Sequence, residues 1–512
     1  MVRLFRNNAF GGELLLDSIL NALELKEMQR KFITNLILLL SLNLLIKPFW
    51  ILGIDRSVQN LVGLEEYGFY FVVFNFSFLF NIFLDLGITN FNIRNIAQHK
   101  QLLNKHFSGI IVVRSLLAVL YIAITFTVAL INGFKGEQLY LLGWIAFNQF
   151  LLSSILYLRS NISGLLMLRT DSLISVLDRV LMIIFCGVLL WGNITSQPFR
   201  IEWFVYAQTA AYMLTAMIAL TIVMIKAKFK RIYWNWPFFV MIVKQSLPFA
   251  TLVFMMSFYN RIDPVLIERI LPSPDGVIQS GIYAKAFRLF DASNQIAFLF
   301  AVLLLPIFSN MIKNDKPVVH IVKLAFSLLF TISVTASISS FFYSHEIMSL
   351  LYPGDNIEST RIFSILMFGF IAISGIYVFG TLLTANGSLK QLNIIAGSAI
   401  VLNLLINIIL IPKMHALGSA YASLSAQSIS VILQAIIVQR IFRFKLNFPY
   451  LGSLVIFAVA MAVAAHYSKQ LPFDWYVNLI LLLAVAFVLS SILRLFSIKR
   501  FISIIREREL PE

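Results

Sequence analysis

The sequence is poor in charged residues and in cysteine. Only 12% of its 512 residues are Asp, Glu, Lys or Arg, whereas 59% are apolar, and the mean hydropathy is +0.86. A soluble protein of this length needs far more charge to cover its surface. Cys186 is the single cysteine, which excludes a disulfide within the chain and a metal site built from cysteines. We therefore expect an all-α integral membrane protein that crosses the bilayer many times.

The sequence also lacks the motifs of several enzyme classes. It contains no G-x-x-x-x-G-K-[ST] loop for nucleotide hydrolysis and no H-E-x-x-H or comparable metal-binding spacing. None of the segments between apolar runs is long enough to form a soluble catalytic domain. The net charge of +16 would suggest nucleic acid in a soluble protein, but here basic cytoplasmic loops explain it. We therefore expect a transporter and not an enzyme, with no bound cofactor, no metal and no nucleic-acid partner.

Apolar runs of about twenty residues predict about fourteen transmembrane helices. The predicted spans are residues 32–54, 67–89, 108–131, 139–157, 173–192, 201–225, 246–262, 281–308, 322–343, 362–384, 392–411, 417–438, 450–466 and 476–495. With the N-terminus in the cytoplasm, Lys and Arg concentrate in the cytoplasmic loops, while each outer loop holds only one. This alternation predicts an even number of helices and places both termini in the cytoplasm.

Two segments that lie six spans apart indicate an internal repeat. They are EEYGFYFVVFNFSFLFNIFLD and QSGIYAKAFRLFDASNQIAFLF, which align Gly68 with Gly281 at a spacing of 213 residues (281 minus 68). Parallel six-helix repeats imply two lobes around a central cavity. The expected parts are a cytoplasmic or interfacial segment (1–31), a first lobe (32–225), an amphipathic cytoplasmic linker (226–245), a second lobe (246–440), and two further helices with a basic tail (441–512).

Ionisable residues inside a membrane span are costly, so they usually face a protein interior or a wet cavity. One such group is predicted in the outer half of the membrane: Lys47, Arg261, Asp263, Lys285, Arg288 and Asp291. On the eighth span, Lys285, Arg288 and Asp291 are spaced i, i+3 and i+6, which predicts neighbours on one face. They would form the cationic wall of a cavity, with Asp291 holding Arg288 in place. In the alternative, the span begins near Leu289, and both cations reach out to the outer interface.

A second group of ionisable residues is predicted in the inner half of the membrane. It contains Asp85, Arg114, Asp178 and Arg179, all in the first lobe. We favour a structural network of ion pairs, because both signs of charge are present. In the alternative, Asp85 or Asp178 takes up a proton or binds a cation during transport.

Three segments resemble a known family. LVGLEEYGFYFVVFNFSFLFNIFLDLGITNFNIRNIAQHK (61–100) resembles the second-helix region of O-antigen (Wzx-like) polysaccharide flippases, which belong to the multidrug, oligosaccharidyl-lipid and polysaccharide exporter superfamily. SLPFATLVFMMSFYNRIDPVLIER with SGIYAKAFRLF resembles the start of their second lobe. LLTANGSLKQLNIIAGSAIVLNLLINIILIPKMHALGSAYASLSAQ (382–427) resembles their tenth to twelfth helices. The resemblance covers most of residues 32–440.

The resemblance implies a transporter that works by alternating access. Members of the family flip polyprenyl-pyrophosphate-linked oligosaccharides to the outer leaflet of the bacterial inner membrane. For this chain it implies such a substrate, contact with membrane lipid, polysaccharide assembly proteins as partners, and coupling to an H⁺ or Na⁺ gradient. Arg288 and Lys285, helped by Arg261 and Lys47, would bind the pyrophosphate, because cationic side chains pair with such anions and Arg does so bidentately.

Other functions stay open at this point. Lipid II flippases also have fourteen helices, which leaves the lipid-linked substrate open. A cation-coupled drug exporter of the same superfamily would favour acidic cavity residues, whereas the eighth span is mainly basic. A membrane polysaccharide polymerase would need larger outer loops than the sequence has.

Overall fold

The structure is a computed structural model of the chain, and it describes residues 41–495 except 44, 90–91, 93–95, 97–101, 166, 193–196, 228–235, 355–356 and 446. Residues 41–43 and 45–49 are helical. They are followed by η1 (Trp50–Asp55), α2 (Arg56–Leu79), η2 (Asn81–Leu84), α4 (Leu102–Ile131), α5 (Glu137–Gly164), α6 (Leu168–Trp191), α7 (Ile201–Ala227) and α8 (Trp236–Arg261). Then come α9 (Asp263–Ile270), α10 (Asp275–Lys313), α11 (Val319–Phe342), α12 (Ser344–Leu351), α13 (Ile357–Ala385), α14 (Leu389–Phe442), α15 (Phe448–Ser468) and α16 (Trp475–Ile492). The described residues contain helices and no strands, which confirms the predicted all-α fold.

Several predicted segments lie outside the described residues. They are the N-terminal segment 1–31, residues 228–235 of the linker and the basic tail after residue 495. Within the described part of the linker, residues 226–227 end α7 and residues 236–245 begin α8, so the structure continues both neighbouring helices into it.

Ten helices of the described residues are long and apolar enough to cross a membrane. α14 has 54 residues and would be about 80 Å long if straight, far more than the ~30 Å of a bilayer core. It turns at His415, where φ is 51°, and so consists of two helices. α2 turns in the same way at Gly63, where φ is 83°. The chain is therefore a multi-pass membrane protein, while the count of fourteen spans stays a prediction.

The first helix ends later than the sequence predicts. The predicted span ends at residue 54, with Asp55 and Arg56 in an outer loop, but the helical backbone continues through η1 into α2 as far as Gly63. Neither Gly nor Pro occurs between Gly53 and Gly63, so the local sequence does not stop the helix at residue 54. As a result, Asp55 lies inside a helix and is buried.

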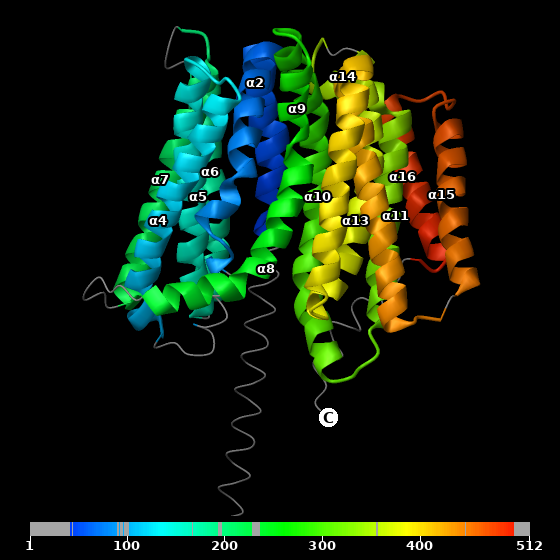
Figure 1. Cartoon of the computed structure of the whole chain (residues 1–512). Coiled ribbons are helices and arrows are strands. Elements are labelled where there is room, and N and C mark those ends of the chain that lie inside the picture. Colours follow the sequence, from blue (N-terminus) through cyan, green and yellow to red (C-terminus); the bar gives the residue numbers. More distant parts are fainter. Residues whose placement is uncertain are drawn as a thin grey trace, which may run out of the picture.

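The helices stand side by side in two groups (Figure 1). α2, α4, α5, α6 and α7 form the first group, and α10, α11, α13 and α14 form the second. α8 begins beneath the first group and rises towards the second (Figure 1). α15 and α16 pack on α11 at the edge of the second group, through buried residues such as Phe457 and Leu482. The assignment of these groups as the two lobes of the repeat stays a prediction.

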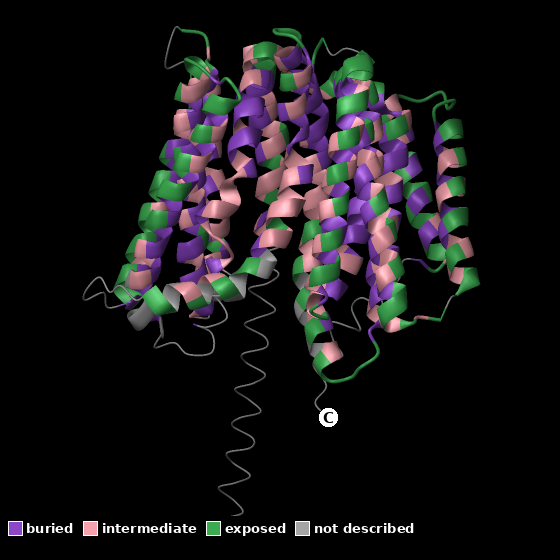
Figure 2. Cartoon of the chain, viewed as in Figure 1, coloured by how far each residue is buried: buried purple, intermediate pink, exposed green. Residues whose placement is uncertain are grey.

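Burial differs between the inner and outer sides of the helices (Figure 2). Residues of α2 and α13 are largely buried, whereas the peripheral helices α4 and α15 carry many exposed residues. Large apolar side chains such as Ile131 and Val455 are among the exposed ones. A broad apolar outer surface of this kind is typical of helices that face lipid.

α2 and α10 cross at the two glycines that the repeat aligns. A Cβ atom on Gly68 would lie 2.1 Å from the carbonyl oxygen of Val277, and one on Gly281 would lie 2.2 Å from that of Leu64. Only glycine lets two backbones approach so closely. Val277 and Leu64 are also 213 residues apart (277 minus 64), so the two copies contact each other at equivalent positions, as in an isologous two-fold contact.

Candidate functional site

A cavity of about 210 Å³ lies between the first helix, α2, α5, α6 and α7 on one side and α8 and α10 on the other. Its ionisable lining residues are Lys47, Asp55, Arg179, Arg261, Arg288 and Asp291. Its uncharged polar lining residues are Tyr70, Asn148, Gln149, Gln208, Tyr212 and Gln295. Four cations face two carboxylates, so the cavity carries a net positive charge. Amide and hydroxyl groups add neutral hydrogen-bond donors beside the cations.

Arg288 of α10 forms an ion pair with Asp55 of η1 and thereby joins the two groups of helices. Its Nε lies 2.9 Å from Asp55 Oδ2 and donates to the Tyr67 hydroxyl at 3.0 Å. The Tyr67 hydroxyl in turn donates to Asp55, with its oxygen 3.0 and 2.9 Å from the two carboxylate oxygens. Among the described residues, every hydrogen bond of Arg288 uses Nε, so both Nη groups are left for another acceptor.

Arg261 at the end of α8 also has donor capacity to spare. Its Nη2 lies 3.6 Å from Asp291 Oδ1, and its guanidinium carbon lies 5.1 and 5.3 Å from the ring centroids of Phe78 and Phe287. Its Nη1 is buried and has no hydrogen-bond partner among the described residues. A buried donor without a partner is costly, so a rotation of the guanidinium that brings Nη1 to an oxygen acceptor in the cavity would be favourable.

The predicted pairing of Asp291 with Arg288 is wrong, since Asp291 lies against Arg261 instead. Arg288 instead meets Asp55 of a neighbouring helix, which the sequence analysis leaves outside the first span. Lys285 lies six residues before Asp291, about 120° away around the helix axis, and is outside the cavity lining. Its Nζ lies 5.2 Å from the ring centroid of Tyr352.

Arg179 of α6 and Lys47 of the first helix bring two further cations into the same cavity. Arg179 Nη1 donates to the Tyr212 hydroxyl at 2.9 Å, and its Nε lies 3.8 Å from Asp178 Oδ2. Its guanidinium carbon lies 5.8 Å from the ring centroid of Trp50. We expected Arg179 in the inner-half group, but the structure places it beside the cations of the outer-half group.

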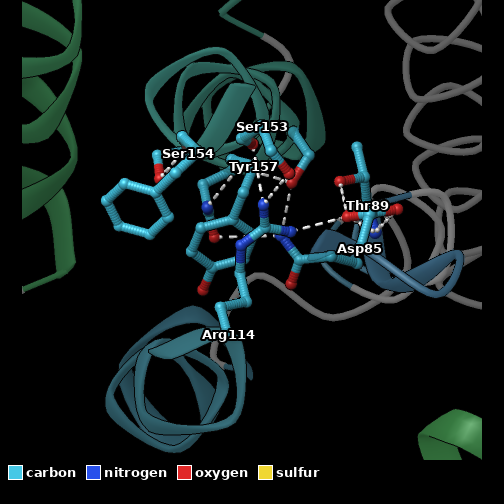
Figure 3. A network of polar contacts seen from close by, with 10 residues as sticks. Asp85, Thr89, Arg114, Ser153, Ser154 and Tyr157 are labelled. Atoms are coloured by element: carbon cyan, nitrogen blue, oxygen red, sulfur yellow. Dashed lines mark hydrogen bonds and ion pairs between the residues drawn. The ribbon is translucent and has the colours of Figure 1, made fainter. Parts of the chain in front are cut away.

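Arg114 of α4 and Asp85 form a separate network (Figure 3). Arg114 Nη1 lies 2.6 Å from Asp85 Oδ1, and Nη2 donates to the carbonyl and hydroxyl oxygens of Ser153 at 2.8 and 2.6 Å. The guanidinium carbon lies 5.0 Å from the ring centroid of Tyr157. Thr89 donates its hydroxyl and its backbone N–H to Asp85. The network ties α4 and α5 to the turn after η2, which is the geometry of a structural ion pair.

Asp263 lies outside the cavity lining, at the start of α9, and is 1% exposed. Its Oδ2 accepts from the Tyr283 hydroxyl at 2.9 Å, and its Oδ1 accepts from the Asn403 and Asn407 amides at 3.1 and 2.9 Å. Asn407 Oδ1 accepts from the Ser419 hydroxyl at 2.5 Å. These partners are all uncharged. Within the described residues, no three His, Cys, Asp or Glu side chains gather as a metal site, so a cation here would use one carboxylate and neutral oxygens.

Asp55 is the charged residue of the cavity lining that the sequence analysis missed. Lys47, Ile51 and Asp55 all line the cavity, and their spacing of four residues places them on one helix face. This periodicity and the absence of Gly and Pro between Gly53 and Gly63 were the available signals. A span that ends at residue 54 hides both.

Comparisons with known proteins place the chain in a family. Residues 33–312, more than half of the chain, match the family described as "polysaccharide biosynthesis protein". None of the curated proteins matches the chain by sequence. Among solved structures, it is similar to "Lipid II flippase MurJ, inward closed conformation", with a TM-score of 0.64 and 17% identity over 87% of this chain and 97% of that chain.

Two further similar structures are transporters of the MOP superfamily. One is from Pyrococcus furiosus, with a TM-score of 0.57 and 13% identity over 82% of this chain and 96% of that chain. The other is an outward-facing multidrug resistance MATE family transporter, with a TM-score of 0.56 and 14% identity over 82% of this chain and 96% of that chain. At these identities they show the fold alone, and it is the fold of membrane transporters, not of enzymes. With the family match, this confirms the resemblance read from the sequence: the chain belongs to the polysaccharide biosynthesis protein family and has the fold of MOP-superfamily transporters.

Proposed function

We propose that the protein is a flippase that moves a polyprenyl-pyrophosphate-linked oligosaccharide across the bacterial inner membrane by alternating access, for O-antigen- or capsule-type surface polysaccharide. The observation that carries the proposal is a cavity with four cations and two carboxylates among membrane helices. Excess charge at membrane depth is costly unless an opposite charge balances it. A pyrophosphate group would balance it, and the family to which the chain belongs acts in polysaccharide biosynthesis.

Two arginines would hold the pyrophosphate. Arg288 offers both Nη groups to phosphate oxygens. Arg261 lines the same cavity, and a rotation of its guanidinium would bring the buried, unpartnered Nη1 to the phosphate. Arg179 of α6 and Lys47 of the first helix add further positive charge. The amides of Asn148, Gln149 and Gln208 are suited to sugar hydroxyls. Lys285 has no part in this arrangement, because it lies against Tyr352.

Alternating access requires the two groups of helices to separate at one end of the cavity. The Gly68–Gly281 crossing and the Asp55–Arg288 pair hold the groups together in this structure. Separation at this crossing would open the cavity at that end of the bundle and expose Arg288 to the water on that side of the membrane. The same movement would release a bound pyrophosphate.

The net positive charge of the cavity argues against a cation-coupled drug exporter, since a site for cationic drugs would need an excess of carboxylates. A lipid II-type substrate stays the alternative for the lipid-linked head group. The proposal places the protein in the inner membrane with both termini in the cytoplasm, which the Lys and Arg content of alternate loops supports. Partners would then be polysaccharide assembly proteins and membrane lipid.

Asp263 is the residue to which we assign coupling to an H⁺ or Na⁺ gradient. It is buried, and its described partners are neutral amides and hydroxyls, so no fixed cation competes for its charge. The amide orientations of Asn403 and Asn407 follow from the hydrogen-bond network, so either can turn its carbonyl oxygen to a bound Na⁺. If this is correct, Asp263→Asn abolishes the Na⁺ or pH dependence of transport. Unchanged dependence in that variant would refute the assignment.

The central test removes the two proposed pyrophosphate ligands. Replacement of Arg288 and Arg261 by Gln, in an Asp55→Asn background so that the buried carboxylate does not lose its cation, is expected to abolish surface polysaccharide in cells that depend on this gene, while the amount of protein in the membrane stays normal. Lys285→Ala is the matched control, because it removes a cation of the same helix outside the cavity lining. Normal display in the variant that lacks both arginines, or loss in the control alone, would contradict the proposal.

A further inference from the structure

A second cavity, of about 260 Å³, lies between α8, α10, α13 and both halves of α14. This volume is close to the lower end of ligand pockets, about 300 Å³. Most of its lining side chains are apolar. The hydroxyl groups of Thr381, Thr384 and Ser430 in the lining donate to carbonyl groups one turn earlier in their own helices. They are therefore satisfied without a ligand, and the cavity offers a largely apolar surface.

One stripe of α10 lines both cavities. Its residues are Arg288, Asp291, Gln295, Phe298, Val302 and Leu305, and the spacings of three and four keep them on one face. The first three line the cationic cavity and the last three line the apolar one. Gln295 and Phe298 are one turn apart, about 4.5 Å along the axis. The surface therefore changes from charged to apolar within one helical turn.

α8 shows the same change in the opposite chain direction. Arg261 lines the cationic cavity, whereas Leu252, Met256 and Tyr259 line the apolar one. α8 rises towards the end of the bundle from which α10 descends (Figure 1). Both helices therefore place the charged part nearer the α2–α10 crossing and the apolar part farther from it. The two linings follow each other along one face of α10, and α8 places them in the same order along the bundle.

We propose that the apolar cavity binds the first isoprene units of a polyprenyl pyrophosphate whose head is held by Arg288 and Arg261. The inference rests on the proposed function and adds a site for the lipid chain inside the protein. It follows from the change from charged to apolar residues along α10, since a polyprenyl pyrophosphate also changes from anion to hydrocarbon within a few bonds. Phe298, Val302 and Leu305 are 43%, 40% and 39% exposed, so the cavity is open along α10 and the rest of the chain can leave it.

Two water-soluble probes separate the head from the chain. Inorganic pyrophosphate carries the head alone, and farnesyl pyrophosphate adds three isoprene units. We expect the purified full-length protein to bind farnesyl pyrophosphate about tenfold more tightly than inorganic pyrophosphate, or better, because apolar surface is buried. Isothermal titration calorimetry in lipid nanodiscs measures both dissociation constants.

A substitution that fills the apolar cavity then tests whether the isoprenoid chain binds there. Val302→Trp places a large ring in the apolar cavity from a partly exposed position, and it should weaken farnesyl pyrophosphate binding about tenfold while leaving inorganic pyrophosphate binding unchanged. Val401→Trp is the matched control, because Val401 is 57% exposed on α14 outside both cavities. It should change neither dissociation constant. Ala301→Phe replaces Val302→Trp if thermal unfolding shows that the first variant does not fold.

The outcomes distinguish the two proposals. Wild-type affinity for farnesyl pyrophosphate in both filling variants would overturn the inference and leave the proposed function intact. Equal affinity of the wild-type protein for both probes would overturn it as well. If the wild-type protein binds neither probe, the proposed function itself fails. Selective loss of the chain-dependent affinity in Val302→Trp, with Val401→Trp unaffected, supports both.

Discussion

The Asp85–Arg114 and Asp55–Arg288 pairs have the same chemistry but differ in what the arginine has left to donate. Arg114 uses Nη1 for Asp85 and Nη2 for a serine, inside one group of helices. Arg288 uses Nε alone, its Nη groups are left beside a cavity, and its pair joins both groups. The difference teaches that saturation of the donors, more than the presence of an ion pair, separates a structural arginine from one available to a ligand.

The largest expected effect is a loss of stability at the Asp85–Arg114 pair, in which the arginine donors are already used. Arg114→Ala leaves Asp85 without its cation and Ser153 without its donor, and it should lower the free energy of unfolding by about 3 kcal/mol or more. Arg114→Met combined with Asp85→Asn removes both charges and should recover most of that loss. Thermal unfolding in detergent checks both variants. If Arg114→Ala unfolds like wild type, the network is not structural, and the comparison fails.

The next effect concerns the crossing that holds Asp55 near Arg288. Gly68→Ala would place a Cβ atom 2.1 Å from a backbone oxygen, so α2 and α10 must move apart at a cost of about 1–3 kcal/mol. Gly452→Ala is the control, because no atom lies within 4 Å of a Cβ there. The measurement is disulfide formation between Leu64→Cys and Val277→Cys, in a Cys186→Ala background because Cys186 is the single native cysteine. Faster crosslinking in the Gly68 variant would contradict the prediction.

A smaller effect tests whether Asp55 competes with the ligand for Arg288. Asp55→Asn removes the fixed negative charge 2.9 Å from Nε and should strengthen inorganic pyrophosphate binding about tenfold, or about 1.4 kcal/mol. Asp85→Asn should leave that affinity unchanged, since Arg114 lies outside the cavity lining. Calorimetry with the purified variants measures both. Equal effects of the two substitutions would erase the functional difference between the pairs.

The fold could be predicted because apolar length and loop charge act over twenty residues and average out local errors. The family resemblance and the all-α membrane class follow from such long patterns. The cavity was predicted in part: Lys47, Arg261, Arg288 and Asp291 line it as expected. Lys285 does not, because its side chain lies against Tyr352 beside α10, a contact that the spacing along one helix cannot predict.

The partners of the charges could not be predicted. The predicted first span ends eight residues before the helix does, and it therefore leaves out Asp55. Asp55 is the partner of Arg288 in the structure, so that ion pair could not be predicted. Arg179 was assigned by depth alone, but its side chain points to Tyr212 in the cavity. Pairing depends on how neighbouring helices are rotated and on which side chains cross between them. A single sequence carries that information only where a repeat or a close glycine contact reveals it, as at Gly68 and Gly281.

The smallest expected effect compares one hydroxyl at each pair. The Tyr67 hydroxyl contacts both Asp55 and Arg288, and the Thr89 hydroxyl contacts Asp85. Tyr67→Phe and Thr89→Val should each lower the free energy of unfolding by about 1 kcal/mol, the usual net value of a hydrogen bond. Only Tyr67→Phe should also change inorganic pyrophosphate affinity, because only this hydroxyl positions an arginine that faces the cavity. Calorimetry and thermal unfolding on the two variants separate the effects, and a change of affinity in Thr89→Val would show that the two pairs are coupled after all.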